Sequence, residues 1–208
     1  MRDTDTIGSK DMAKKAAAII AGIFGFLLCI QVLSVVFQPK WCDGTCTTLM
    51  ADGFYAEESF DVVFLGTSQI LFAVSPMEIY DGYGLKTYDC ATGGQPIVDT
   101  YYWLRETVER FHPPVVVVEI FGVMEEGAVN EPSIREAIDS MKNGKNRLLA
   151  IRDTLANYDI SSDALSFLIP FLRYHDRWNE LTTEDFVYPF QKGTYDMRGY
   201  VPSTRILN

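Results

Sequence analysis

The sequence is short of basic residues, histidine and cysteine, and it has no internal repeat and no low-complexity tract. Its 208 residues hold 18 Lys and Arg against 28 Asp and Glu, which gives a formal net charge of −10. Nucleic-acid binding needs a basic surface to neutralise phosphates, so the net charge argues against a nucleic-acid partner. The 37 residues at the N-terminus hold four of the basic and three of the acidic residues, so the acidic character belongs to the rest of the chain.

The four cysteines offer little chemistry. Cys29 lies inside an apolar run and is interpreted as an inert small hydrophobe. Cys42 and Cys46, in Cys-Asp-Gly-Thr-Cys, would close a small disulfide loop in an oxidising compartment. Metal binding is the weaker alternative, because no second Cys or His pair follows. We therefore predict no metal and no cofactor. Cys90 is read as a buried thiol at a strand end rather than a second nucleophile.

A run without charge, residues 16–37, predicts a membrane-spanning helix. Its 22 residues would span about 33 Å as a helix, enough for a hydrocarbon core of about 30 Å. A cleavable signal has a shorter apolar region. Basic residues concentrate before the run, with only Lys40 close after it and Trp41 at the boundary, so we expect residues 1–15 to form a cytoplasmic tail. The prediction is a single-pass signal anchor in the plasma membrane with an extracytoplasmic domain.

One face of that helix carries small residues. Ala17, Ala21 and Gly25 follow one another at four-residue spacing, which permits close packing against a membrane partner. The alternative is that alanine and glycine are simply common in membrane helices.

Beyond the anchor we expect a juxtamembrane linker over 38–59 and one α/β domain over 60–208. Apolar runs and turn residues predict an alternation of strands and helices, followed by three helices. The strands are expected at 61–66, 85–91 and 115–121, the helices between them at 76–83 and 96–111, and the later helices at 131–141, 146–156 and 161–173. This alternation is typical of a parallel sheet, and the valine run of the third strand predicts burial on both faces.

Two strand ends carry the candidate chemistry. Gly66-Thr67-Ser68 follows the first strand, and Gly93-Gly94-Gln95-Pro96 follows the second. In an open α/β sheet, ligands bind beyond the carboxyl ends of the strands, so Ser68 is placed to be a nucleophile. The alternative role for Ser68 is a helix N-cap or turn serine. A nucleotide site is a weaker hypothesis, because the motif lacks the further glycines and the ribose-binding acid that such sites need.

The order of these segments resembles the SGNH (GDSL-like) hydrolases over residues 16–190. The nearest branch is membrane-anchored and extracytoplasmic, of the alginate O-acetyltransferase or teichoic-acid D-alanine-transfer type. The segment 174–178 (Tyr-His-Asp-Arg-Trp) is similar to a region of anchored members. The resemblance implies a flavodoxin-like sheet, Ser68 as nucleophile, and an oxyanion hole made by the N–H groups of Ser68 and of Gly94 or Gly93.

The chain departs from that family in two places. The family's base lies in Asp-x-x-His, and neither histidine here has that context. We interpret His112 as a helix-terminal residue at the wrong end of the sheet, which leaves His175 as the candidate base. Residues 121–124 (Phe-Gly-Val-Met) stand where the family has Gly-x-Asn-Asp. We expect this chain to be an N-terminal portion of a longer protein; the alternative is a naturally short relative that binds without reacting.

Three further side chains complete the predicted site. Gln95 is expected to contact substrate, and Glu119 either faces the site or pairs with a basic residue. Trp178 would stack on a sugar ring, with helix packing as its alternative role. The sequence thus predicts a membrane-anchored esterase or O-acyltransferase that acts on cell-envelope glycans through a serine acyl-enzyme, its partners being the membrane and an acylated glycan or acyl donor. The alternative is a catalytically silent anchored protein that binds a glycan or a partner.

Overall fold

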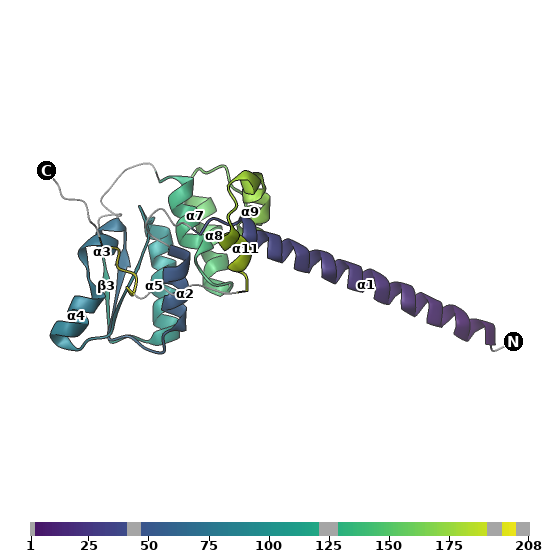
Figure 1. Ribbon diagram of the computed structural model, residues 1–208, viewed down its shortest axis with the longest axis horizontal. Coiled ribbons are helices and arrows are strands. Elements are labelled where there is room, and N and C mark those ends of the chain that lie inside the picture. Colours follow the sequence, from purple (N-terminus) through teal and green to yellow (C-terminus); the bar gives the residue numbers. More distant parts are fainter. Residues whose placement is uncertain (1–2, 41–46, 121–128, 191–196, 203–208) are drawn as a thin grey trace. The chain divides into compact units, whose positions relative to one another are not determined.

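The protein is described by a computed structural model over residues 3–40, 47–120, 129–190 and 197–202 (Figure 1). It divides into two compact units. Unit 1 combines Met1–Gln38 with Ile169–Phe190, and unit 2 combines Pro39–Leu168 with the C-terminal residues 191–208. Residues 169–190, which belong to the domain predicted over 60–208, pack with the N-terminal helix in unit 1.

Unit 2 is built on a parallel sheet of three strands in the order β2-β1-β3. The strands are β1 (Val62–Gly66), β2 (Thr87–Ala91) and β3 (Val115–Val118). Val62 pairs with Thr87 on one side and with Val115 on the other. The predicted α/β class and parallel sheet are confirmed, and each predicted strand is present at or within its expected bounds.

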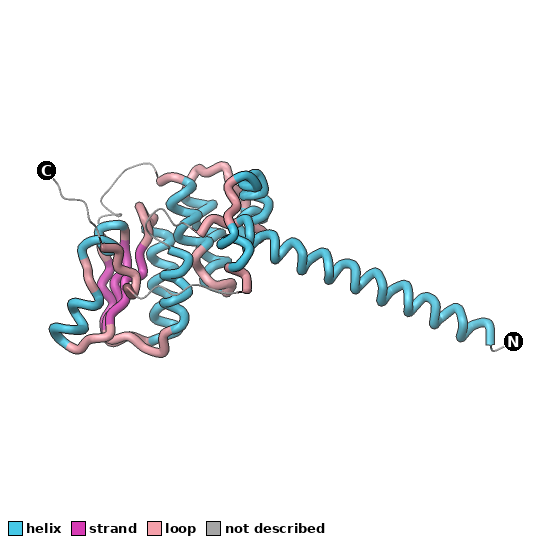
Figure 2. Tube along the Cα trace, viewed as in Figure 1, coloured by secondary structure: helices cyan, strands magenta, loops and turns pink. Residues whose placement is uncertain are grey.

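Helices flank both faces of this sheet. Figures 1 and 2 show α3 and α4 on one side of it and α2 and α5 on the other. The helices of unit 2 are α2 (Thr47–Ala56), α3 (Ser68–Ala73), α4 (Pro76–Tyr83), α5 (Ile97–Phe111), α7 (Glu131–Asp139), α8 (Lys145–Asn157) and α9 (Ala164–Leu168). Pro76 opens α4 and Pro96 is the N-cap of α5, as their fixed φ angles favour.

The main core of unit 2 lies between the sheet and α2, α5, α7 and α8. Phe54 of α2 is fully buried at its centre. Five aromatic rings surround it at centroid distances of 4.9 to 5.7 Å, those of Tyr55, Phe60, Tyr88, Trp103 and Phe111. Such contacts add to the hydrophobic gain from burial.

The predicted linker over 38–59 is consequently wrong for α2. The helix places Met50, Ala51, Phe54 and Tyr55 on one buried face, a spacing present in the sequence but hidden by its Asp and Gly residues. Cys42 and Cys46, with their predicted bridge, lie outside the described residues.

The third strand differs from its prediction. Because β3 is at the edge of the sheet, Val115 and Val117 remain 48% and 39% exposed, while Val116 and Val118 pack on the core. Burial on both faces is therefore wrong for this strand. A valine run alone cannot reveal whether a strand lies at the centre or at the edge of a sheet.

Unit 1 consists of one long helix and a cluster of short ones. These are α1 (Asp3–Phe37), α10 (Phe171–Tyr174), the 3-10 helix η1 (His175–Asn179) and α11 (Thr183–Val187). Residues 12–37 of α1 are long and apolar enough to cross a membrane. The single helix predicted over 161–173 is wrong: α9 and α10 are separate, and Pro170, which has no N–H to donate, precedes α10.

Candidate functional site

Ser68 lies directly beyond the carboxyl end of the central strand. It is the first residue of α3, and the N-cap is Thr67, whose hydroxyl accepts a hydrogen bond from the Gln69 N–H at 3.4 Å. Thr67 thus fills the capping role that was the alternative for Ser68. Ser68 is half-buried as a residue, and within the described part of the chain its hydroxyl has no hydrogen-bond partner. The hydroxyl is therefore not committed to a contact among those residues.

Glu119 connects the end of β3 to this turn. Its carboxylate accepts hydrogen bonds from the Thr67 hydroxyl at 2.8 Å and from the Thr67 N–H at 3.1 Å. Its own N–H donates to the Leu65 carbonyl at 2.8 Å. These hydrogen bonds place the Glu119 carboxylate at the turn that carries Ser68.

Gly66 is what lets Glu119 approach so closely. A Cβ on residue 66 would lie 2.6 Å from Glu119 Cβ and 3.1 Å from Ile70 Cγ1. The glycine before Thr67 is thus required by packing, because any side chain would displace the carboxylate from the turn.

The glycine pair after β2 lies against α7. Gly94 has φ 62°, in the left-handed region that glycine favours, and a Cβ there would lie 3.1 Å from Ser133 Oγ. The Gly93 N–H donates to the carboxylate of Glu136. Burial raises the pKa of Glu136 to about 7, and the Gly93 hydrogen bond opposes that shift. Of the two glycines proposed as oxyanion donors, Gly93 already has the Glu136 carboxyl group as its partner.

Gln95 is buried and holds the turn together. Its side-chain carbonyl accepts from the Thr92 hydroxyl at 3.2 Å, and its amide donates to the Thr100 hydroxyl at 3.0 Å. The residue is only 2% exposed, and its side chain links the end of β2 to the start of α5. The substrate contact of Gln95 stays a prediction.

The parallel strands bring these groups to one end of the sheet, the end at which the carboxyl ends of all three strands lie. Parallel strands end on the same side, so Ser68, Glu119 and the Gly93-Gly94 turn follow the carboxyl ends of β1, β3 and β2. The Thr92 N–H also donates to the Gly66 carbonyl at 3.4 Å. The chain runs from β2 back across β1 to β3, so the direction of winding reverses at β1, the position at which α/β sheets bind ligands.

The two histidines belong to different units. His112 ends α5 with φ 48° and precedes β3, at the opposite end of the strands from Ser68, so its interpretation as a helix-terminal residue is confirmed. His175 is exposed in η1, with Nδ1 3.1 Å from the Leu172 carbonyl. His175 and Trp178 belong to unit 1, whereas Ser68, Glu119 and the Gly93-Gly94 turn belong to unit 2.

The remaining candidates are quickly placed. Burial, with the neighbouring charges of Asp89 and Glu106, raises the pKa of the Cys90 thiol, which makes it an inert core residue. In the described residues no cluster of three or more His, Cys, Asp or Glu is arranged to hold a metal ion. Residues 121–124 lie outside the described ranges.

Glu119 and Glu136 both lie at the carboxyl ends of the strands, and the sequence alone does not link them to one arrangement. Glu119 interrupts a valine run, which was a visible signal. Glu136 lies on an amphipathic helix far along the chain, and only the tertiary packing brings it to Gly93. Comparison with family models, with curated proteins and with solved structures yields no match to this chain.

Proposed function

We propose that this chain is a membrane-anchored, extracytoplasmic protein of the SGNH (GDSL-like) type, an esterase or O-acyltransferase that acts on cell-envelope glycans. The observation that carries the proposal is the Ser68 hydroxyl, unpartnered among the described residues, at the carboxyl end of the central strand. The order β2-β1-β3 is also that of the first three strands of a flavodoxin-like sheet, in which ligands bind at this reversal point.

The chemistry assigned to Ser68 is acyl transfer in two steps. Ser68 Oγ attacks the carbonyl carbon of an acyl donor and loses its proton to a base, the donor's alcohol leaves, and an ester to Ser68 remains. A sugar hydroxyl or a water molecule then takes the acyl group and restores the serine. The Ser68 N–H, which as the first of α3 has no acceptor within its helix, and the Gly94 N–H are the candidate oxyanion donors.

The membrane placement is part of the same proposal. Residues 12–37 of α1 would supply the span, and the basic residues before it favour a cytoplasmic N-terminus with unit 2 outside. Close packing of a membrane partner on Ala17, Ala21 and Gly25 is a secondary proposal, supported by the four-residue spacing of these small residues.

A second candidate function is a catalytically silent anchored protein that binds a glycan or a partner. The position of His112 favours it, because this residue, the one histidine in the sequence of unit 2, ends α5 at the opposite end of the strands from Ser68. A serine hydroxyl at its ordinary pKa is a poor nucleophile without a neighbouring base.

The two candidates differ in how Ser68 reacts with an active-site probe. The full-length protein in native membranes would be treated with a fluorophosphonate and compared with Ser68→Ala. Ser59→Ala is the matched control, since Ser59 is exposed before the amino end of β1. The enzyme proposal expects labelling of the parent and of Ser59→Ala but not of Ser68→Ala. Equal labelling of the parent and Ser68→Ala would exclude Ser68 as nucleophile, and an unlabelled parent would favour the silent binding protein.

A further inference from the structure

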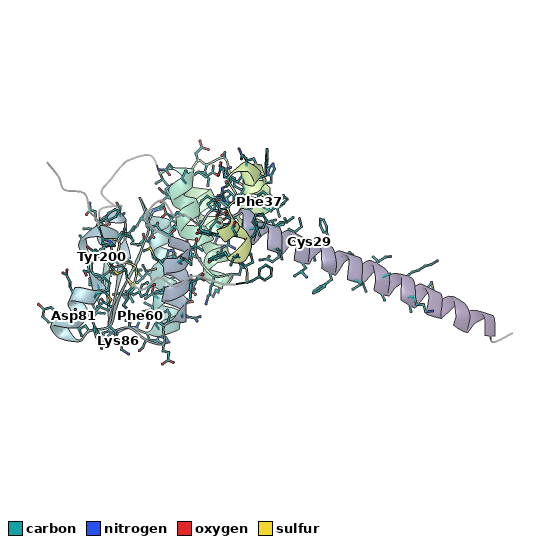
Figure 3. The ribbon with its side chains drawn as sticks, in the orientation of Figure 1. Cys29, Phe37, Phe60, Asp81, Lys86 and Tyr200 are labelled. Atoms are coloured by element: carbon teal, nitrogen blue, oxygen red, sulfur yellow. The ribbon has the colours of Figure 1, made fainter. Side chains whose placement is uncertain are left out.

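The segment 169–190 is held against the C-terminal end of α1. The Phe171 N–H donates to the Ser34 hydroxyl at 3.3 Å, and the Phe171 ring meets the Phe37 ring edge-to-face at 5.2 Å. Arg177 Nη1 donates to the Phe37 carbonyl at 2.6 Å. Helices α10, η1 and α11 all contact α1. The segment therefore surrounds the last turn of the apolar helix, the end at which Phe37 lies (Figure 3).

The length of the uncovered part of α1 places this segment at a membrane boundary. The apolar residues 16–32 have mostly exposed side chains, whereas Ser34 and Val36 are buried under the segment. Those 17 residues span about 26 Å, less than the roughly 30 Å of a hydrocarbon core. If α1 crosses a bilayer, as the proposed function requires, the remaining few ångströms of the hydrocarbon thickness are spanned by residues 33–37. The segment that covers them must then reach the edge of the hydrocarbon.

The surface of the segment suits that depth. It carries large apolar side chains that remain exposed, with Trp178 73% and Phe190 83% accessible. The others are Leu172, Phe186 and Val187. Exposed apolar groups gathered on so short a segment mark a contact with lipid or with another molecule. Tryptophan in particular favours the boundary between hydrocarbon and head groups.

The polar groups of the contact are paired, as a low-dielectric boundary requires. Arg177 Nε donates to Glu180 at 2.9 Å, so the charge of the guanidinium is balanced. Its Nη1 donates to the Phe37 carbonyl, which satisfies a backbone acceptor at the last residue of α1. The Ser34 hydroxyl is likewise hydrogen-bonded. Over 169–190 the sequence holds four acidic residues against two arginines, so attraction to anionic lipid is not the driving force.

We propose that the segment 169–190 inserts its exposed aromatic and aliphatic side chains into the leaflet at the C-terminal end of α1. The ligand is a phospholipid surface, bound through apolar burial rather than through charge. Unit 1 would then hold the membrane at two places, the spanning helix and this interfacial segment.

The test uses Trp178 as a depth probe. The full chain is reconstituted into phosphatidylcholine vesicles, with and without bromine on the acyl chains, and its tryptophan fluorescence is compared with that of Trp178→Phe. The difference between the two spectra is the emission of Trp178. We expect that emission to be blue-shifted, to be lost on bromination of the lipid, and to be shielded from aqueous iodide. Trp103 is the control, measured alone in a Trp41→Phe, Trp178→Phe double variant, because it is buried in the core of unit 2 and should respond to neither quencher.

Flotation of the vesicles separates the possible failures. A protein that does not float with them lacks the anchor, which overturns the membrane part of the proposed function and this inference with it. A protein that floats, but whose Trp178 is quenched by iodide and not by bromolipid, overturns this inference alone and assigns the exposed surface to a protein partner. Phe190→Trp in the Trp178→Phe background repeats the test at a second position, and quenching by iodide alone there would also contradict the proposal.

Discussion

Asp89 gives the sharpest test of the packing of unit 2. It lies in the middle of β2, it is 1% exposed, and neither carboxyl oxygen has a hydrogen-bond partner among the described residues. Its N–H donates to the Arg198 carbonyl at 3.0 Å, and a Cβ on the adjoining Gly199 would lie 1.9 Å from the Asp89 carbonyl oxygen. Burial in this closed position raises the pKa of Asp89 to about 8.

The sign of the effect on stability follows from proton counting. Between pH 4 and pH 8 the unfolded chain has released the Asp89 proton, while the folded chain retains it. The unfolded state therefore binds fewer protons, and the free energy of unfolding falls as the pH rises through that window. At 1.36 kcal/mol per pH unit, the loss over the window has an upper bound of about 5 kcal/mol. That equals the whole stability of a weakly stable domain.

Asp89→Asn removes this loss, because an amide of the same shape does not ionise. The assay is urea unfolding of the full chain in detergent micelles at pH 5 and pH 8, with Asp81→Asn as control, since Asp81 is exposed on α4 (Figure 3). The parent and the control should lose stability together, and Asp89→Asn should lose clearly less. Some loss should remain, because burial raises the pKa of Asp99 and of Glu136 to about 7. Equal losses in the parent and Asp89→Asn would refute the assigned pKa.

Two substitution pairs test other contacts through chemical denaturation. Gly66→Ala should destabilise the protein by about 1–3 kcal/mol, because its Cβ would lie 2.6 Å from Glu119 Cβ. Gly82→Ala, in a helix with open space around it, should raise stability by about 0.4–1 kcal/mol, and equal effects of the two would contradict the close approach. Phe54→Ala should cost about 3–5 kcal/mol, whereas Tyr83→Ala, at an exposed ring, should stay within about 0.5 kcal/mol. A small effect at Phe54 would mean that α2 is not part of the core.

Much of the fold could be predicted because its signals are local. Pro76, Pro96 and the Pro113-Pro114 pair mark helix boundaries that the structure confirms. The position of Ser68 at a strand end could likewise be read from the apolar run before it. Two expectations differ from the structure: the linker over the residues of α2 and the burial of both faces of β3. Burial depends on which segments from elsewhere in the chain pack against an element, and a local pattern does not show this.

For the same reason, only part of the candidate site could be predicted from the sequence. Ser68 and the glycine pair follow directly from strand ends, but Gln95 is buried in the turn that it was expected to expose. The Thr67–Glu119 hydrogen bonds join residues 52 positions apart. Such contacts depend on strand order, and no local pattern encodes it.

The sequence alone therefore determined the apolar helix, the alternation of strands and helices, and a serine beyond the first strand, since each rests on the conformational preferences of neighbouring residues. Only the tertiary structure decided what surrounds Ser68. Thr67 caps α3, and its hydroxyl donates to the Glu119 carboxylate, which lies close to Gly66. The Gly93 N–H is hydrogen-bonded to Glu136. The tertiary structure also assigned residues 169–190 to the end of α1. These outcomes depend on the close packing of segments that are distant in the chain.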